Sequence, residues 1–234
     1  MTRRTYTFRR TPAWVLAGLL LLAFFVGRGE STPALEPSAP ATAPTVTTSR
    51  ALALLARLSV KGRAPKTGYQ RSLYGEPWVD VDHNGCRTRD DVLTRDLTQR
   101  QYRDRCVVVA GTLLDPYTHQ VHEFRKASAA AIQIDHVVSL SDAWQKGAQQ
   151  WTPEKRLAFA NDPLELMAVS RDVNQAKSDA DAASWLPPYK PFRCAFVARQ
   201  VQVKATYGLW VTGAERDAIR RVLAGCPADR SLPR

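Results

Sequence analysis

The chain has 234 residues, with 33 Lys or Arg against 22 Asp or Glu, a formal net charge of +11 and 44% hydrophobic residues. This composition excludes a disordered tail protein, a disulfide-dense miniprotein and a polytopic membrane protein. Residues 1–50 contain six Arg and two acids, which leaves 27 basic and 20 acidic residues, or +7, beyond them. A body of that charge attracts polyanions such as nucleic acid, anionic lipid or wall polymers.

Residues 1–30 are typical of an export signal or an N-terminal membrane anchor. Four arginines among the first ten residues precede the apolar run 13–26, which is shorter than the ~20 residues that span a bilayer. No small-residue cleavage site closely follows Val26, so a cleaved signal and an uncleaved membrane tether both stay open. Either way, we expect the body to be extracellular or at the cell surface.

Residues 31–68 are expected to form a tether and a lead-in to the folded domain. Ser, Thr, Pro and Ala dominate 31–49, a composition too poor in large apolar groups to fold. The helical pattern of 51–58 is interrupted by Gly62 and Pro65, which indicates a short lead-in helix or more tether. The domain itself is expected over 69–226, with a tail at 227–234.

The four cysteines become interpretable if the chain is exported, because thiols outside the cytoplasm tend to pair. Four cysteines allow three connectivities. We favour the two pairs that are closest in sequence, each of which encloses one compact segment: Cys86 with Cys106, and Cys194 with Cys226. Zinc is disfavoured because the sequence has no CxxC motif and no Cys-His cluster.

The middle of the chain predicts two strand pairs. Residues 106–114 and 121–124 are β-rich and flank the turn Asp115-Pro116-Tyr117, which indicates an N-terminal β-hairpin region. A third apolar run, 130–134, ends in Asp135-His136, and 164–169 is expected to be another strand.

Helices are expected around and after these strands. The predicted ranges are 141–149, capped by Ser141, then 153–160, 171–178, 192–207 and 212–223, the last opened by a capping box of Thr212 and Glu215. Three prolines hold the segment before 192 out of helix, so Trp185 should lie on a loop packed against the body.

The chemistry concentrates between residues 134 and 179. Neighbouring side chains on an extended strand point opposite ways, so Asp135 could bind a metal while His136 turns toward a water at the substrate phosphate. Asn174, on the expected helix 171–178, could supply a second hard oxygen ligand. Two protein oxygens, with the remaining positions left to water and phosphate, indicate Mg²⁺ rather than zinc.

A second metal site is conceivable in the acidic loop 80–91, whose oxygens have the spacing of a calcium loop. The match is partial, because the twelfth residue is Asp91 and not Glu. A structural Ca²⁺ and a plain Asn-Gly turn beside a disulfide both stay open, and the turn is favoured. In that case Arg87 and Arg89 would be free to reach phosphate. The calcium ligands would be Asp80, Asp82 and Asn84.

Several motifs occur together in one order, and with them the chain resembles a secreted bacterial HNH endonuclease. More narrowly, it is similar to HNH proteins related to the C-terminal nuclease domain of GmrSD-type restriction enzymes. The similarity runs from about Tyr69 to Cys226. The motifs are Ile134-Asp135-His136-Val137-Val138-Ser139-Leu140, Phe159-Ala160-Asn161-Asp162-Pro163, Asn174-Gln175-Ala176-Lys177-Ser178-Asp179 and Trp185-Leu186-Pro187-Pro188.

The resemblance implies an α+β fold with a ββα-metal (HNH, or His-Me finger) core and additional C-terminal helices. It implies that Asp135 and Asn174 bind Mg²⁺ or Mn²⁺, and that His136 is the general base. Lys177 would touch phosphate or brace Asp179. One position departs from the family: Glu165 replaces an Asn that buttresses the histidine loop.

Glu165 leaves two interpretations open. It could orient His136 through a carboxylate-imidazole hydrogen bond, or it could repel phosphate and weaken catalysis. Asn161 is a conceivable substitute for the missing Asn, but Asn-Asp-Pro more often makes a turn before a strand.

The interpretation that explains these features together is an exported, monomeric, metal-dependent endonuclease. Its expected substrate is DNA rather than RNA, with low sequence specificity because no base-reading motif is present. The alternative is a catalytically weak or inactive HNH-fold module that binds nucleic acid or other anionic polymers at the cell surface.

Overall fold

The computed structural model describes residues 47–227. The expected signal or anchor, the first part of the tether and residues 228–234 of the tail lie outside this range. Within it, no helix has the length and apolar character needed to cross a membrane.

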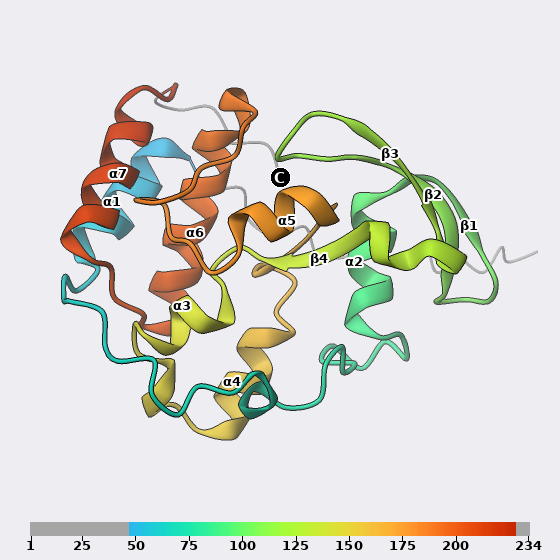
Figure 1. Ribbon diagram of the computed structural model, residues 1–234, viewed down its shortest axis with the longest axis horizontal. Coiled ribbons are helices and arrows are strands. Elements are labelled where there is room, and N and C mark those ends of the chain that lie inside the picture. The colour runs from blue at the N-terminus through green and yellow to red at the C-terminus, as the bar shows by residue number, and fades with distance from the viewer. Residues whose placement is uncertain (1–46, 228–234) are drawn as a thin grey trace, which may run out of the picture. The chain divides into compact units, whose positions relative to one another are not determined.

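Three helices pack together on one side of the fold: α1 (Thr48–Arg57), α6 (Arg193–Tyr207) and α7 (Gly213–Ala224) (Figure 1). Ala51 and Leu55 of α1 are buried in the same core as α6 and α7. The expected boundary at residue 69 is therefore wrong, because the apolar stripe of α1 is covered by these two helices. The folded unit already includes α1.

A three-stranded antiparallel sheet lies on the opposite side of the fold, with strand order β1-β2-β3. The expected hairpin is confirmed as β2 (Val108–Leu114) and β3 (Val121–Arg125). Strand β1 (Thr98–Tyr102) was not predicted, because its sequence is polar and all five residues are exposed, so it has no alternating pattern. Helix α2 (Thr88–Asp96) packs against β2 and β5.

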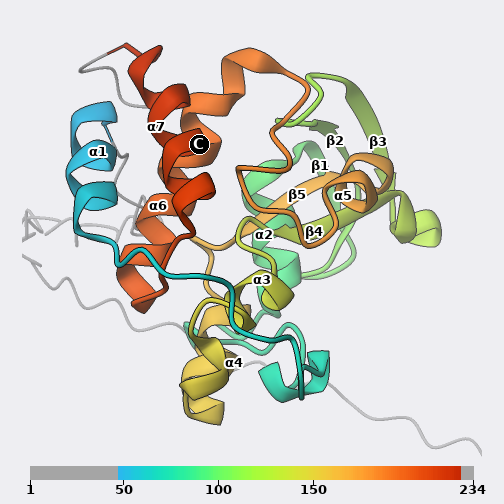
Figure 2. The same ribbon diagram turned by 60° about the vertical axis from the view of Figure 1, so that its left-hand side comes forward.

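Between the two sides lies the unit that positions the site. Strands β4 (Ile132–His136) and β5 (Leu166–Ser170) pair antiparallel, and β5 runs directly into α5 (Arg171–Lys177) (Figure 2). Both faces of the pair are buried: Met167 and Val169 join the core of α1, α6 and α7, while Leu166 and Ala168 join the core under the three-stranded sheet. This explains why β5 is a continuous apolar run.

Shorter helices complete the chain. Helix α4 (Pro153–Ala160) begins as predicted, whereas α3 (Leu140–Trp144) is capped by Ser139 and not by Ser141, and it ends well before residue 149. The capping box of Thr212 and Glu215 is present. The 3-10 helices are η1 (Arg71–Tyr74), η2 (Lys126–Ala131), η3 (Ala148–Gln150) and η4 (Lys190–Phe192).

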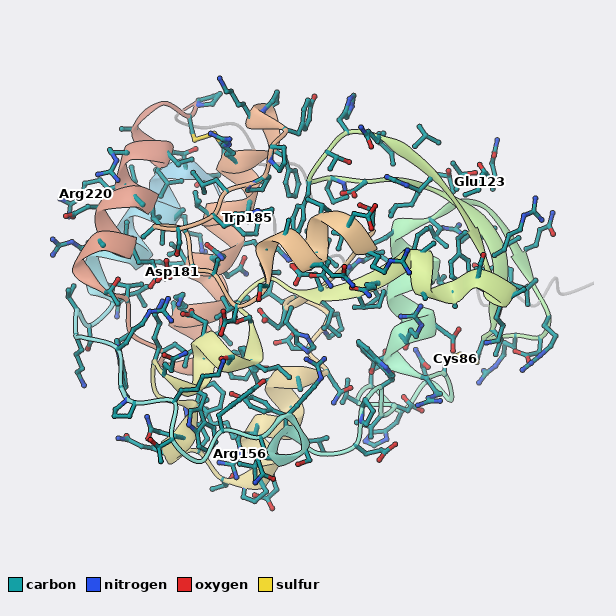
Figure 3. The ribbon with its side chains drawn as sticks, viewed as in Figure 1. Cys86, Glu123, Arg156, Asp181, Trp185 and Arg220 are labelled. Carbon is teal, nitrogen blue, oxygen red and sulfur yellow. A yellow bond between two sulfur atoms is a disulfide. The ribbon has the colours of Figure 1, made fainter. Side chains whose placement is uncertain are left out.

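Both predicted disulfides are present, Cys86–Cys106 and Cys194–Cys226. The first joins the loop before α2 to the loop between β1 and β2. The second joins the start of α6 to the segment after α7. Trp185, labelled in Figure 3, is half-buried and packs edge-on against Tyr117 and Phe196, as expected of a loop residue held against the body.

A buried cluster of charges connects the helices to the segment after α5. Lys146 donates to Asp142, Asp181 and Glu215 at 2.7–2.8 Å, and Lys204 contacts Asp142 and Glu215 at 3.2 and 2.9 Å. Burial alone would raise the pKa of Asp142, but the charges of Lys204 and Lys146 hold that pKa below its ordinary value.

The sixth member of this cluster is half-buried Arg63, which contacts Asp142 at 3.0 Å and Asp181 at 2.8 Å. With it the cluster contains three positive and three negative groups. The segment between α1 and η1 is thus tied by charge to α3 and to the chain after α5.

Candidate functional site

The end of β4 brings the two central residues into place. In the register of the pair, Asp135 faces Met167 and His136 faces Leu166 across the strands. Because β5 continues into α5, Asn174 is carried back along the same pair of strands. The two strands and the helix that follows them thus bring together Asp135 and Asn174, which are 39 positions apart in sequence.

A pocket of about 340 Å³ lies at this place. It joins β4 and α5 to residues from η1 and from the loop before α3. Asp135, His136 and Asn174 all line it, so the structure brings the three predicted residues to one cavity, whereas Glu165 and Lys177 do not line it. The lining residues are Arg71, Gln133, Ile134, Asp135, His136, Ser139, Leu140, Asn174, Gln175 and Ser178.

His136 is held by a backbone carbonyl. Its Nε2 lies 3.0 Å from the oxygen of Ala160, which can only accept, so the neutral ring carries its proton on Nε2 and its lone pair on Nδ1. Trp78 stacks on the ring with centroids 6.3 Å apart. Burial, followed by the positive charge of Arg71, lowers the pKa of His136 from 6.5 to about 3. The imidazole is therefore neutral and held in place, with Nδ1 unprotonated.

Asp135 is buried between two donors. The hydroxyl of Tyr117 donates to Oδ2 at 2.6 Å, and the ammonium of Lys177 donates to Oδ1 at 2.8 Å and to the carbonyl of His136 at 2.8 Å. The expected contact between Lys177 and Asp179 is absent, since Asp179 accepts from Lys66 and Ser141 instead. Lys177 is fully buried beneath β4, which places its charge on Asp135.

Asn174 presents an oxygen to the pocket. Its amide nitrogen donates to Oε1 of Gln133 at 2.8 Å, which leaves the amide oxygen as the atom that a cation could use. Carboxylate and amide oxygens are ligands that suit Mg²⁺ or Mn²⁺, so the donor set fits a hard cation. Between residues 47 and 227, no three His, Cys, Asp or Glu side chains form a metal-binding cluster.

Glu165 supports the histidine loop through the backbone. Its side chain is fully buried; Oε1 accepts from the amide of Val138 at 3.0 Å, and its carbonyl accepts from Val137 at 2.9 Å. Of the two interpretations left open for Glu165, the carboxylate-imidazole hydrogen bond with His136 is absent, and the ring bonds through Nε2 to the carbonyl of Ala160. Burial raises the pKa of Glu165 well above 4.5, which the charge of Lys177 only partly offsets. A neutral carboxyl can replace an amide as an acceptor here.

The other candidate, Asn161, ends α4 and donates to the carbonyl of Leu157 at 3.0 Å. It makes the turn expected of Asn-Asp-Pro. The support of the histidine loop therefore comes from Glu165.

Arg71 is a pocket residue that the sequence did not reveal. It is exposed on η1, far from the motifs in sequence, and its position beside His136 depends on how η1 packs against α3 and α4. Of the arginines expected at phosphate, Arg87 is exposed, whereas Arg89 is half-buried and donates to the carbonyl of Ile132 at 3.3 Å. Arg89 therefore supports the start of β4.

Comparison with known proteins places this geometry in a family. Residues 87–222 match the family described as "GmrSD restriction endonucleases, C-terminal domain". The chain belongs to this family. A protein of Arthroderma benhamiae, named "Uncharacterized secreted protein", is 37% identical over 198 residues, which cover 84% of this chain and 93% of that protein. No solved structure matches the chain.

The GmrSD C-terminal domain match contains every predicted residue of the pocket but not all of its wall. Asp135, His136 and Asn174 fall inside the matched range, while Arg71 and Trp78 precede it. The helices and small antiparallel sheets are consistent with the α+β class, and the family match supports a nuclease relationship. Arg71, which lines the pocket, and Trp78, which stacks on the ring of His136, therefore come from outside the matched range.

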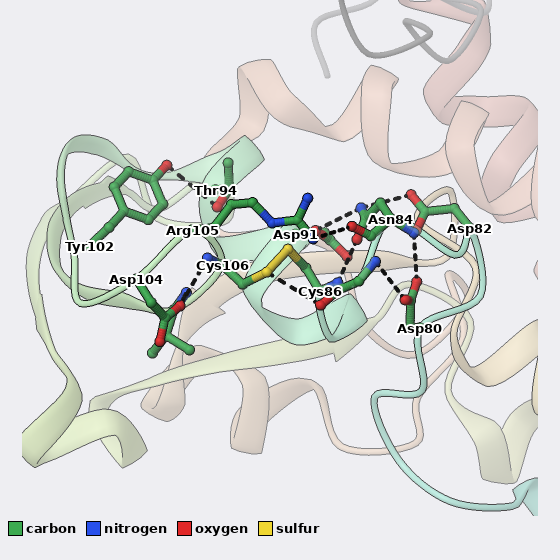
Figure 4. Close-up of a disulfide and its surroundings, with 12 residues drawn as sticks. Asp80, Asp82, Asn84, Cys86, Asp91, Thr94, Tyr102, Asp104, Arg105 and Cys106 are labelled. Carbon is green, nitrogen blue, oxygen red and sulfur yellow. Dashed lines mark hydrogen bonds between the residues drawn. A yellow bond between two sulfur atoms is a disulfide. The ribbon is translucent and has the colours of Figure 1, made fainter.

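The first part of the acidic loop, with Asp80, Asp82 and Asn84, also precedes the GmrSD match, and the loop is closed by its own hydrogen bonds (Figure 4). The Asn84 backbone amide donates to Asp80 and Asp82 at 3.1 and 3.3 Å, and its side-chain amide donates to Asp82 and Asp91 at 3.1 and 3.2 Å. The backbone amide of Gly85 donates to Asp80 at 2.7 Å. This is the geometry of an Asn-Gly turn beside a disulfide, and calcium binding there stays a prediction.

Proposed function

We propose that the chain is an exported, metal-dependent endonuclease that hydrolyses the phosphodiester bonds of DNA with low sequence specificity. The observation that carries the proposal is the single pocket that carbonyl-held His136 lines together with Asp135 and Asn174. Membership of the GmrSD C-terminal domain family supports the nuclease class.

His136 would act as the general base. The Ala160 carbonyl fixes the ring, and Nδ1 would take the proton of the attacking water. The pKa of about 3 is too low for an efficient base, but a bound phosphate adds negative charge beside the ring and raises that pKa. Binding of the substrate phosphate would thus make His136 a stronger base.

Asp135 and Asn174 would hold a divalent metal, and together they form the metal part of a ββα-metal core. A metal ion bound there stabilises the charge that develops on the phosphate. Lys177, whose ammonium contacts Asp135, would balance the local charge from beneath β4. Arg71, exposed at the edge of the pocket, would bind a phosphate oxygen, and Arg87 could contact the backbone further along the nucleic acid.

The site of action would be extracellular or at the cell surface. Support comes from the two disulfides, from the arginine-rich apolar segment at the N-terminus and from a relative that is named as secreted. Export would use a signal peptide or an N-terminal membrane tether, and the enzyme would act as a monomer.

The test is the conversion of supercoiled plasmid to nicked and linear forms by the purified full-length chain, in Mg²⁺ or Mn²⁺ and in EDTA. We expect cleavage that requires metal, and a loss of roughly 10²- to 10⁴-fold in His136→Ala. His119→Ala is the matched control, because His119 is an exposed histidine that does not line the pocket. Full activity in His136→Ala, or cleavage that survives EDTA, refutes the assignment. An RNA of equal length tests the preference for DNA.

One observation favours a second candidate function. Lys177 already neutralises Asp135, so the position of one metal ligand is shared with a buried ammonium. In that form the chain would bind nucleic acid or other anionic polymers without cutting them. A gel shift of the plasmid with no nicking at any Mg²⁺ or Mn²⁺ concentration would distinguish this module from the enzyme.

A further inference from the structure

The turn between β2 and β3 reaches into the site from outside the β4-β5-α5 unit. Asp115 and Tyr117 are both fully buried, although they belong to a hairpin turn, which is ordinarily a surface element. Tyr117 contacts the end of β4, and Asp115 contacts the end of β5. Packing in the core accounts for the ring of Tyr117 but not for the two polar groups, its hydroxyl and the carboxylate of Asp115, that the turn places at the ends of β4 and β5.

Tyr117 makes the shorter of the two side-chain hydrogen bonds to Asp135. Its hydroxyl lies 2.6 Å from Oδ2, while Lys177 lies 2.8 Å from Oδ1. The two donors differ in charge: the ammonium of Lys177 competes with a cation for the carboxylate, whereas the phenol is neutral. The phenol donates its one hydroxyl proton to Oδ2 and adds no charge beside the carboxylate. Tyr117 is thus the partner that can stay on Asp135 when a cation approaches.

Asp115 holds the start of α5, the helix that carries Asn174. One carboxylate oxygen accepts from the amide of Ser170 at 3.0 Å, and the other accepts from the amide of Tyr117 at 2.8 Å. Ser170 is the last residue of β5 and the residue from which α5 starts. The carboxylate of Asp115 therefore connects the start of α5, which carries Asn174, to Tyr117, which holds Asp135.

We propose that the Asp115-Pro116-Tyr117 turn is a positioning element of the site, in which Tyr117 orients the carboxylate of Asp135 toward a divalent cation and Asp115 sets the distance to α5. This inference rests on the proposed metal-dependent function and adds residues that lie outside the ββα unit. Tyr117 and Asp115 act through Asp135 and α5 and need not touch the cation or the substrate.

The hydroxyl of Tyr117 can be removed without removing its ring. The ring packs against Trp185, Phe192 and Phe196 with centroids 5.3–6.0 Å apart, and these contacts remain in Tyr117→Phe. Tyr207→Phe is a matched control, since the Tyr207 hydroxyl donates to Asp162 at 2.7 Å, a tyrosine-carboxylate hydrogen bond away from the pocket. Both variants lose one tyrosine-carboxylate hydrogen bond, but only Tyr117→Phe loses it at the pocket.

The experiment measures Mn²⁺ binding to the full-length chain by calorimetry without nucleic acid, together with thermal unfolding and plasmid cleavage. We expect both variants to unfold at a somewhat lower temperature, and Tyr117→Phe alone to raise the Kd for Mn²⁺ by about 10-fold or more. Asp115→Asn, which replaces one acceptor by a donor, is expected to raise that Kd as well.

Three outcomes would count against the proposal in different ways. An equal Kd for Tyr117→Phe, Tyr207→Phe and the unmodified chain, with metal-dependent cleavage intact, refutes the positioning role and leaves the nuclease assignment standing. An equal rise in both variants shows a general effect of stability and also refutes it. An unmodified chain that neither binds Mn²⁺ nor cleaves plasmid refutes this inference and the proposed function together.

Discussion

Replacing Glu165 by Gln and by Ala separates the charge of this side chain from its hydrogen bond. Oε1 of Glu165 accepts from the Val138 amide at 3.0 Å, and the side chain is fully buried. Gln keeps the length and the acceptor oxygen but cannot ionise. Ala removes the acceptor and leaves the Val138 amide unpaired in the interior, directly beside the histidine loop.

The expected magnitude follows from these contacts. A buried amide left without a partner costs about 1–3 kcal/mol, and the loss of a buried methylene adds about 0.8 kcal/mol. We therefore expect Glu165→Ala to lower the free energy of unfolding by about 2–4 kcal/mol.

In contrast to Glu165→Ala, Glu165→Gln is expected to become more stable relative to the unmodified chain as pH rises. The folded pKa of Glu165 lies above its unfolded value of about 4.5, so the stability that the native protein holds below pH 4.5 is lost as pH rises through the folded pKa. Glu165→Gln does not titrate, so its stability relative to the unmodified chain should improve from pH 4 to pH 8.

The assay is urea unfolding at pH 4, 6 and 8, with plasmid cleavage measured on the same samples. Glu76→Gln, an exposed glutamate changed in the same way, is the control for the general effect of removing one negative charge. If Glu165→Gln at pH 8 is as unstable as Glu165→Ala, the charge of Glu165 is needed and the neutral-carboxyl argument is wrong. Cleavage that falls in Glu165→Gln without loss of stability would make the charge catalytic.

Three further predictions follow from the site and from the buried charges. Arg71→Ala should weaken DNA binding in EDTA and reduce the slope of log K against log salt by about 1, whereas Arg220→Ala, at an exposed residue of α7, should leave the protein's metal-dependent cleavage rate unchanged. The folded pKa of His136 lies below its unfolded value, so its stability contribution is lost as pH falls through the window from 6.5 to about 3. This loss is about 2 kcal/mol between pH 8 and pH 5, and it should disappear from unfolding curves of His136→Asn. Lys204→Met leaves the carboxylates of the buried cluster short of one cation. We expect the free energy of unfolding, measured in urea, to fall by about 3–5 kcal/mol and thermal unfolding to occur at a lower temperature.

The sequence predicted the parts of the site that depend on local pattern. The apolar runs of β4 and β5, the polar residues at the end of β4 and the helix after β5 can each be recognised from a short stretch of the sequence. The two disulfides were also predictable, because each joins cysteines that are close in sequence. These features need only local propensity and short-range order.

The contacts that were missed all depend on tertiary packing. Tyr117 reaches Asp135 only because the β2-β3 turn is buried against β4, and no pattern around the turn indicates a partner 18 residues away. Arg71 reaches the pocket through the packing of η1. Helix α1 resembled a tether because its own sequence is short and interrupted, and its burial is decided by α6 and α7. For Glu165 the sequence left a bond to His136 and a repulsion of phosphate both open, and its actual partner, the amide of Val138, is 27 residues away in sequence.

The two ends of the described chain meet at one corner of the fold. The hydroxyl of Thr48 donates to the carbonyl of Pro227 at 2.7 Å, one residue beyond the cysteine that is stapled to α6. Helices α1, α6 and α7 line no part of the pocket. A mechanical force applied to either end of the described chain therefore acts first on α1, α6 and α7, which the disulfide cross-links, and not on β4 or α5. A bead, a surface or a fused domain joined at this corner would be attached to helices that do not line the pocket, whichever end of the described chain carries the attachment.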